Sequence, residues 1–169
     1  MTSSPFAVNV HDLMHKPGQM REKALEVAVE ERMGNYAVGI ELGEKLEIDI
    51  RLESVHEGIL ATGDVFATAT GECSRCLDPI ETAVEVDFQE LFAYSGTSED
   101  DFVVVDEQID IDQVIRDAVV LSLPFQPVCD ANCDGLCPTC GAKYKDDPQH
   151  THEAAIDPRW NGLKSLKED

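Results

Sequence analysis

The sequence feature that most restricts the possible folds of this chain is the alternation of apolar and charged residues in its middle. Residues 46–53 read Leu-Glu-Ile-Asp-Ile-Arg-Leu-Glu, and the same two-residue period returns over residues 80–88. Because successive side chains of a strand point to opposite faces, both stretches predict half-buried strands, which should be antiparallel neighbours. Between them, residues 59–70 are rich in Thr, Val and Ala and are bounded by Gly58 and Gly71. This composition predicts the central strand of a meander.

Weaker patterns flank this sheet on both sides. Residues 8–13 predict a short strand or a turn of helix, and alternation over residues 25–29 predicts a strand. Residues 102–105 predict one more short strand, followed by a helix with Asp110 as its N-cap and Pro124 at its end. Five residues recur at helical spacing and are expected in the core: Ile111, Val114, Ile115, Ala118 and Val119.

The length and composition indicate one globular α+β domain. The chain has 169 residues, of which 43% are hydrophobic and 28% charged, which is ordinary for a folded protein. We expect an antiparallel, partly closed sheet with one main helix over residues 1–128. Residues 129–169 should form a cysteine-rich metal knuckle and a C-terminal tail within the same single domain, 1–169.

The charge is far from balanced, because 34 acidic residues against 13 basic ones give a formal charge of −21. Such a field repels phosphate backbones, so nucleic acid would have to be bound through a local basic patch. A basic protein is the easier partner to infer. The alternative is that the acidity confers only solubility or reflects a proteome that is acidic throughout.

The sequence predicts a cytoplasmic protein with reduced cysteines. Its start, Met-Thr-Ser-Ser-Pro-Phe, is not that of a secretory signal, and its longest wholly apolar run spans only residues 118–121, far short of the roughly 20 residues needed to cross a membrane. In a reducing compartment the six cysteines are better explained as metal ligands or buried thiols than as disulfides.

The strongest chemical signal is Cys137-Pro-Thr-Cys140-Gly141. Two intervening residues let both sulfurs face one ion, and the glycine permits a tight turn, which together predict a zinc knuckle. Zinc needs four ligands, and the remaining two are expected among four nearby residues: Cys129, Cys133, His150 and His152. With only protein ligands the Zn²⁺ would be structural. The alternatives are free buried thiols and histidines that are merely solvated.

A second pair, Cys73-Ser-Arg-Cys76, lies at the predicted turn between two strands. Zinc ribbons place a knuckle at such a turn, so this pair can face the first one. Against this, the sequence separation from Cys137 is much longer than the roughly 15 to 20 residues usual in ribbons. Redox chemistry is the other option, although no thioredoxin-like pattern surrounds the pair.

Three motifs in order give the chain a family resemblance: Cys73-Ser-Arg-Cys76-Leu-Asp-Pro79, Cys133-Asp-Gly-Leu-Cys137-Pro-Thr-Cys140-Gly141 and Asp157-Pro-Arg159. The chain resembles the YceD family of large ribosomal RNA subunit accumulation proteins over most of its length. The resemblance implies a non-catalytic role in accumulation or processing of 23S rRNA. Many relatives have a second cysteine pair before the Asp-Pro-Arg motif, where this chain has His150 and His152, and this favours the two histidines as ligands.

Two functional hypotheses follow, and neither is an enzyme. The first is a ribosome-assembly factor whose acidic surface binds a basic ribosomal protein or assembly partner. The second is direct rRNA contact through C-terminal basic and aromatic residues; alternatively, that stretch is a terminal helix packed through its tryptophan. The sequence has none of the common catalytic motifs, and we expect no small-molecule substrate and no membrane contact. The RNA-binding candidates are Lys143, Lys145, Arg159, Trp160, Lys164 and Lys167.

Overall fold

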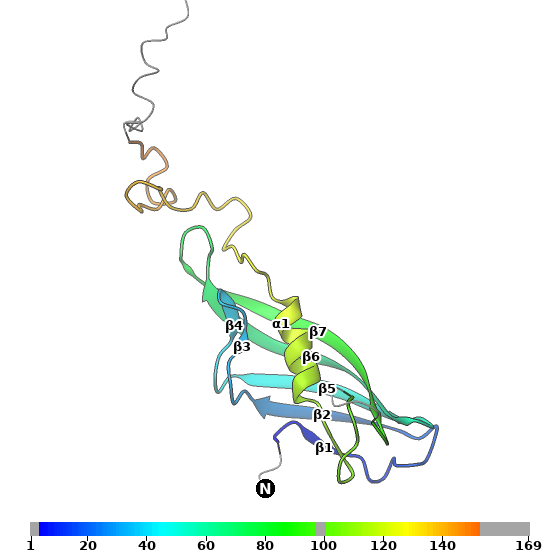
Figure 1. Cartoon of the computed structure of the whole chain (residues 1–169). Coiled ribbons are helices and arrows are strands. Elements are labelled where there is room, and N and C mark those ends of the chain that lie inside the picture. Colours follow the sequence, from blue (N-terminus) through cyan, green and yellow to red (C-terminus); the bar gives the residue numbers. More distant parts are fainter. Residues whose placement is uncertain (1–3, 97–100, 153–169) are drawn as a thin grey trace, which may run out of the picture.

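The computed structural model describes residues 4–96 and 101–152. A six-stranded sheet curls into a half-barrel, a two-stranded sheet lies at one end, and one helix crosses the hollow side (Figure 1). The elements are β1 (Ala7–Asn9), β2 (Met20–Ala28), β3 (Met33–Gly34), β4 (Val38–Ile40), β5 (Lys45–Ser54), β6 (Gly58–Glu72), β7 (Pro79–Ala93), β8 (Gln108–Asp110) and α1 (Asp112–Ser122).

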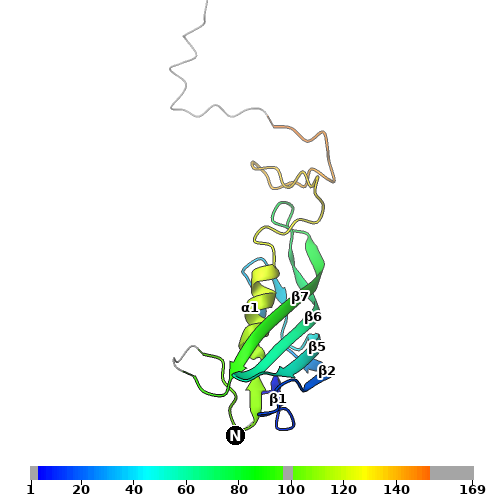
Figure 2. The same cartoon turned by 90° about the vertical axis from the view of Figure 1, so that its right-hand side faces the viewer.

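Strand β6 is the centre of the large sheet. Its neighbour on one side is β7, paired along the whole length from Gly58↔Ala93 to Glu72↔Pro79. On its other side it pairs first with β5 and then, farther along, with β4. Strand β2 extends the sheet beyond β5, and all of these pairs are antiparallel (Figure 2). The predicted meander, with residues 59–70 as its central strand, is confirmed. The prediction that the strands at residues 46–53 and 80–88 are antiparallel neighbours was wrong, because β6 lies between them.

The alternation in the sequence sets the two faces of this sheet. In β5, Leu46, Ile48, Ile50 and Leu52 are each at most 2% exposed, whereas the charged residues between them point outward. The same division holds along β7, where Val84, Phe88 and Phe92 are buried and Glu85 and Asp87 are exposed. One face of the sheet therefore forms the core, and the other is strongly acidic.

Gly63 allows the sheet to curve tightly in its middle. A Cβ atom added there would lie 2.5 Å from the carbonyl oxygen of Asp49 and 3.0 Å from the ring of Phe88. Phe88 is the cross-strand partner of Gly63, and its ring occupies the space that a side chain on β6 would need. A glycine inside a strand at such a close approach is typical of bent and curled sheets.

Helix α1 covers the concave face of the sheet. Val114, Ile115 and Val119 are buried, and the helix contacts β7 and β3, so the predicted core stripe is confirmed. The helix ends where Leu123 adopts an extended backbone (φ −72°, ψ 136°), because the residue before a proline avoids the helical region. The N-cap prediction was wrong.

The residue at the N-cap position is Ile111, with no side-chain cap. Asp110 instead ends β8, and its carboxylate accepts the N–H of Asp112 at 3.0 Å. Strand pairing between β8 and β1, which joins Asp110 to Ala7, takes the aspartate out of the helix. The strand predicted over residues 102–105 was also wrong, since only isolated bridges form there, at Val103 and Val105.

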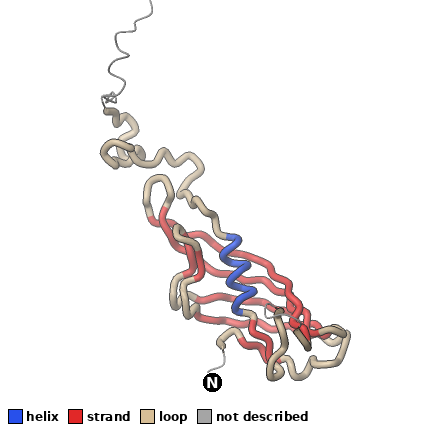
Figure 3. The backbone as a smooth tube through the Cα atoms, viewed as in Figure 1, coloured by secondary structure: helices blue, strands red, loops and turns tan. Residues whose placement is uncertain are grey.

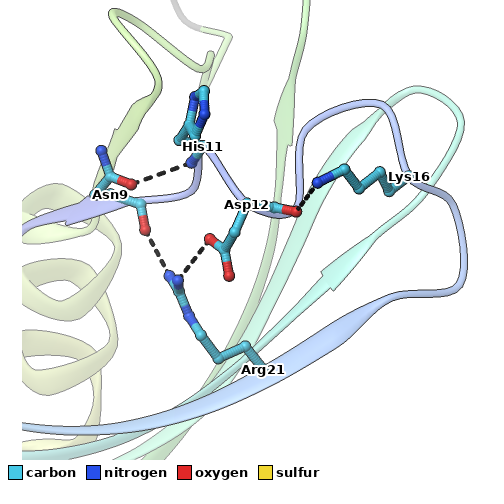
Figure 4. Close-up of polar contacts among 5 residues, drawn as sticks. All are labelled: Asn9, His11, Asp12, Lys16 and Arg21. Carbon is cyan, nitrogen blue, oxygen red and sulfur yellow. Dashed lines mark hydrogen bonds and ion pairs between the residues drawn. The ribbon is translucent and has the colours of Figure 1, made fainter.

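Arg21 fastens the N-terminal loop to the edge of the sheet (Figure 4). From β2, its guanidinium donates to the Asp12 carboxylate at 2.6 Å and to the carbonyl oxygen of Asn9 at 2.5 Å. Lys16 donates to the carbonyl oxygen of Asp12 at 2.8 Å. These contacts close the end of the half-barrel opposite the cysteine-rich segment (Figure 1).

Residues 124–152 leave the helix and run past the tip of the β6–β7 hairpin almost entirely as turns and loops (Figure 3). Such a segment has little regular hydrogen bonding to hold it, so another kind of cross-link is expected there. Among the described residues, no helix is long and apolar enough to span a membrane.

Ile48→Ala tests the assignment of the two sheet faces. Ile48 is 1% exposed, so we expect urea unfolding to show a loss of about 2–5 kcal/mol. Glu47→Gln, one residue away on the outer face, should change the free energy of unfolding by less than about 0.5 kcal/mol. Equal losses in the two variants would contradict the assignment.

Candidate metal sites

The six cysteines and two of the histidines gather into two separate clusters. In each, one ligand atom from every residue lies within 4.8 Å of the other three. The first cluster consists of Cys73, Cys76, Cys129 and Cys133, and the second of Cys137, Cys140, His150 and His152.

The first cluster joins the tip of the β6–β7 hairpin to the segment that follows α1. Cys73 and Cys76 lie in the turn between β6 and β7 and are buried, while Cys129 is exposed. The N–H of Ser74 donates to the carbonyl oxygen of Pro127 at 2.8 Å. These contacts bring together sulfurs that are far apart in sequence, so this cluster is a cross-link between two parts of the fold.

Arg75, between the two cysteines of the hairpin, fixes the loop that carries the other two. Its Nη1 donates to the carbonyl oxygen of Cys133 at 2.9 Å and to that of Ala131 at 3.3 Å. The loop also passes close to the backbone of Arg75, because a Cβ atom on Gly135 would lie 3.0 Å from the Arg75 carbonyl oxygen. Gly135 has φ of 80°, which glycine adopts without strain.

The turn at Cys73 has a characteristic hydrogen-bond pattern. The N–H of Cys73 donates to the carbonyl oxygen of Asp78 at 2.8 Å, and the N–H of Leu77 donates to the carbonyl oxygen of Cys73 at 2.9 Å. Leu77 has φ of 59°, an unusual conformation for a side chain of this type. The turn therefore stores backbone strain that its surroundings must offset.

The turn at Cys137 repeats that pattern residue for residue. The N–H of Cys137 donates to the carbonyl oxygen of Ala142 at 2.8 Å, and the N–H of Gly141 donates to the carbonyl oxygen of Cys137 at 2.8 Å. Gly141 has φ of 75°, in the place that Leu77 takes in the first turn. The chain thus contains two equivalent knuckles, one on the hairpin and one in the C-terminal segment.

The sulfur spacing of the first cluster suits a tetrahedral ion. The Sγ atoms of Cys73 and Cys133 are 3.9 Å apart, and those of Cys76 and Cys129 are 3.6 Å apart. A tetrahedral ion with metal–sulfur bonds of about 2.3 Å requires sulfurs about 3.8 Å apart. These two spacings match a tetrahedral ion, and all four sulfurs lie within 4.8 Å of one another.

The electrostatics of the first cluster favour a cation among the sulfurs. The backbone N–H of Cys76 outweighs burial and lowers the pKa of the Cys73 thiol to about 6. For Cys76, the backbone N–H of Asp78 favours the thiolate, but burial and the three other thiols raise the pKa to about 12. A bound cation would remove this conflict, because it stabilises all four thiolates together.

The second cluster combines two thiols with two imidazoles. Sγ of Cys140 is 3.1 Å from Nε2 of His150 and 3.2 Å from Nε2 of His152, and the two Nε2 atoms are 2.9 Å apart. On the far side of its ring, Nδ1 of His150 lies 3.8 Å from the Asp147 carboxylate. Asp147 thus lies on the side of the ring from which a hydrogen-bonded carboxylate would orient a metal-binding histidine, at a distance longer than a hydrogen bond.

The Cys137 thiol is prepared for ionisation. Burial alone would raise its pKa, but donors outweigh that effect and lower it to about 5. These donors are the backbone N–H groups of Thr139 and Cys140 and the hydroxyl of Tyr144. The hydrogen bond to Cys137 in turn raises the pKa of Tyr144. A low thiol pKa favours metal binding at neutral pH, because fewer protons must be displaced.

An ion pair connects the two knuckles. Lys143, from the second, pairs with the carboxylate of Asp78, from the first, and the two side chains are 39% and 25% exposed. The hydrogen bond from Lys143 lowers the pKa of Asp78, and the pKa of Lys143 is raised in return. The two clusters are thus adjacent and mechanically linked.

The residues predicted as ligands are divided between the clusters in a way that the sequence did not settle. His150 and His152 lie beside Cys137 and Cys140, whereas Cys129 and Cys133 lie beside the hairpin pair. The hairpin pair does not face the second knuckle as the ribbon analogy suggested. Sequence reasoning also missed the supporting residues Asp78 and Tyr144. The position equivalent to Asp78 in the second knuckle is Ala142, so the repeated turn carried no signal for the carboxylate.

The RNA-binding candidates are mostly outside the described residues, where Arg159, Trp160, Lys164 and Lys167 lie. Of the other two, Lys143 is engaged with Asp78, and Lys145 is exposed.

Comparison with known proteins supplies the context for these clusters. Residues 61–167 match the family described as large ribosomal RNA subunit accumulation protein YceD. An uncharacterized protein of Mycobacterium tuberculosis is 47% identical over 171 residues, covering 97% of this chain and 82% of the relative.

Two more distant relatives extend the comparison. The uncharacterized protein YlbN of Bacillus subtilis is 28% identical over 127 residues, 72% of each chain. A chloroplastic protein of Zea mays, named large ribosomal RNA subunit accumulation protein YCED homolog 1, is 49% identical over 67 residues, 39% of this chain and 22% of that protein. No solved structure matches the chain.

The division into two clusters predicts two metal ions per chain that can be removed separately. We expect native mass spectrometry to show two ions in the wild type, one in Cys76→Ser and one in Cys140→Ser, because each variant breaks a different ligand set. Ser74→Ala, which keeps every ligand, is the control. Loss of both ions in each variant, or of neither, would refute two independent sites.

Proposed function

The chain belongs to the YceD family of large ribosomal RNA subunit accumulation proteins, and from this membership we propose that it is a non-catalytic factor for large-subunit biogenesis. It acts in the cytoplasm and promotes accumulation of 23S rRNA by binding a ribosomal protein or an assembly partner. The family match carries the proposal. The names of the family and of the maize relative both state accumulation of large-subunit RNA.

Two Zn²⁺ ions hold the C-terminal segment in the conformation that binds the partner. Four thiolates, or two thiolates with two imidazoles, are the donor sets that zinc takes in structural sites. Each cluster supplies four protein donors, which would fill the coordination of a tetrahedral ion and leave no position for water or substrate. This supports a structural role for the metal and a binding role for the chain.

The outer face of the sheet supports a basic protein as the partner. Three exposed aspartates lie in one row across three strands, since Asp64 on β6 is directly opposite both Asp49 on β5 and Asp87 on β7. Like charges directly opposite each other destabilise a sheet. Among the ion pairs of the described residues, none includes these three side chains. Lysines or arginines of a partner would relieve the repulsion.

The next row continues the same surface. Phe66, 36% exposed, has Glu47 on one side and Glu85 on the other, and Glu26 extends the row on β2. An apolar ring surrounded by carboxylates suits a basic protein better than an RNA backbone. We define the acidic face as these two rows: Glu26, Glu47, Asp49, Asp64, Phe66, Asp87 and Glu85.

Cells that lack the gene test the role in RNA accumulation. We expect the ratio of 23S to 16S rRNA to fall in the deletion strain and to be restored by the wild-type gene. Cys76→Ser and Cys140→Ser should restore it poorly, because the C-terminal segment loses its cross-links. Thr139→Ala, an exposed position in the second knuckle that keeps every ligand, should restore it fully. An unchanged ratio of 23S to 16S rRNA in the deletion strain would refute the proposed function.

The acidic face predicts a charge-specific loss of affinity. The triple variant Asp49→Asn, Asp64→Asn, Asp87→Asn should bind RNA-free large-subunit ribosomal proteins about tenfold more weakly, or about 1.4 kcal/mol. Its free energy of unfolding should not fall, because repulsion is removed. Glu30→Gln, Glu31→Gln, Glu57→Gln removes the same charge from other exposed positions as a control. Equal weakening of both variants would mean that only net charge matters.

A further inference from the structure

A groove lies where the sheet, the hairpin tip and the post-helix segment meet. It has a volume of about 770 Å³ and is lined by residues of all three, including Tyr36 from the β3–β4 turn, Leu77 from the hairpin tip and Val128 from the segment after α1. We call it the junction groove. Cys73 of the first metal cluster also lines it, so its shape depends on the cross-link that this cluster provides.

The junction groove gathers large apolar side chains that the fold leaves uncovered. Tyr36 is 84% exposed, Leu77 57% and Val128 40%. Phe125, 73% exposed, adjoins them, because the hydroxyl of Tyr36 donates to its carbonyl oxygen at 3.1 Å. Uncovered aromatic and aliphatic side chains in one hollow are characteristic of protein-binding sites.

The walls of the groove are already held in place. Asn35, beside Tyr36, donates from Nδ2 to the carbonyl oxygen of Pro124 at 3.1 Å. The N–H of Ser74 fixes Pro127, and the two prolines restrict the backbone between them. A groove whose walls are fixed before binding loses less conformational entropy when it is filled.

Charge distinguishes a polypeptide from an RNA strand as the occupant. Exposed aromatic rings can stack on bases, but Glu72 lines the groove, and Asp130 lies two residues beyond Val128. The cation of the lining, Arg75, already donates to two carbonyl oxygens of the neighbouring loop. With a net charge of −21 on the whole chain, a phosphate backbone would be repelled and a cationic segment attracted.

We propose that the junction groove binds a segment of a large-subunit ribosomal protein in which an apolar or aromatic residue is flanked by lysines or arginines. The apolar residue packs between Tyr36 and Val128, and the flanking cations meet Glu72 and the acidic surface around it. This inference rests on the proposed function and adds the surface and the kind of segment. The acidic face attracts the partner at long range, and the groove provides the close contact.

Photo-crosslinking of the full-length, metal-loaded protein tests this assignment. The photoreactive amino acid p-benzoylphenylalanine replaces one of four residues: Tyr36 in the groove, Phe125 beside it, Phe66 on the acidic face, or Val105. Val105 is 58% exposed and lies before α1, outside the lining of the groove. All four side chains are exposed, so the fold should tolerate each change. The probes are RNA-free large-subunit ribosomal proteins and, separately, protein-free 23S rRNA.

We expect crosslinks from positions 36 and 125 to one ribosomal protein, at least fivefold more abundant than from position 105. The crosslinked peptide should contain an apolar residue flanked by Lys or Arg. Tyr36→Ala should weaken binding of that protein by about tenfold or more, while Val105→Ala should change it less than twofold. Metal content and circular dichroism of each variant show whether the fold is intact.

Other outcomes overturn the inference in distinguishable ways. Crosslinks to ribosomal proteins from position 66 alone would refute the groove and leave the proposed function standing. Crosslinks from positions 36 and 125 to 23S rRNA alone would show that the groove binds RNA and not a polypeptide. Crosslinks to neither probe from any position would count against the groove and the proposed function together.

Discussion

The continuous pairing of β6 with β7 is the interaction on which the rest of the structure depends. It runs unbroken from Gly58↔Ala93 to Glu72↔Pro79, so the hairpin is long enough to serve two purposes. One half contributes Val65, Phe88 and Phe92 to the core beneath α1. The other half adds Ala69 and Val84 to the same core and ends in the turn that carries Cys73 and Cys76 (Figure 1). Any shift of register along the hairpin would move both the core and the first metal cluster.

The cysteine-rich segment is organised by that tip rather than by a core of its own. Arg75 and Ser74 hydrogen-bond to the segment after α1, and the ion pair of Asp78 with Lys143 links the second knuckle to the first. A surface ion pair stabilises weakly by itself, so metal–ligand bonds would supply most of the free energy that orders residues 124–152. The junction groove is a product of this arrangement, because its walls come from both sides of the first cluster.

The parts of the fold that are periodic could be predicted from the sequence, and the parts that depend on distant contacts could not. Alternation identified β5 and β7, composition between two glycines identified β6, and helical spacing identified the buried face of α1. The pairing of β1 with β8 joins Ala7 to Asp110, and no local sequence pattern predicts a contact between residues so far apart in the chain. The same strand pairing prevents Asp110 from serving as the N-cap of α1. The metal sites likewise have a part that local sequence predicts and a part that depends on distant contacts. The knuckle at Cys137 is local and was evident, but the pairing of Cys76 with Cys129, 53 residues apart, requires the hairpin to be built first.

Zinc K-edge X-ray absorption of the purified wild-type protein tests most directly the central claim that two closed zinc sites organise the C-terminal segment. Averaging one site of four sulfurs with one of two sulfurs and two nitrogens predicts about three sulfur ligands near 2.3 Å and about one nitrogen near 2.0–2.1 Å per zinc. An average of two sulfurs and two nitrogens would mean that the first cluster does not bind zinc. A coordination shell rich in oxygen would contradict closed structural sites altogether.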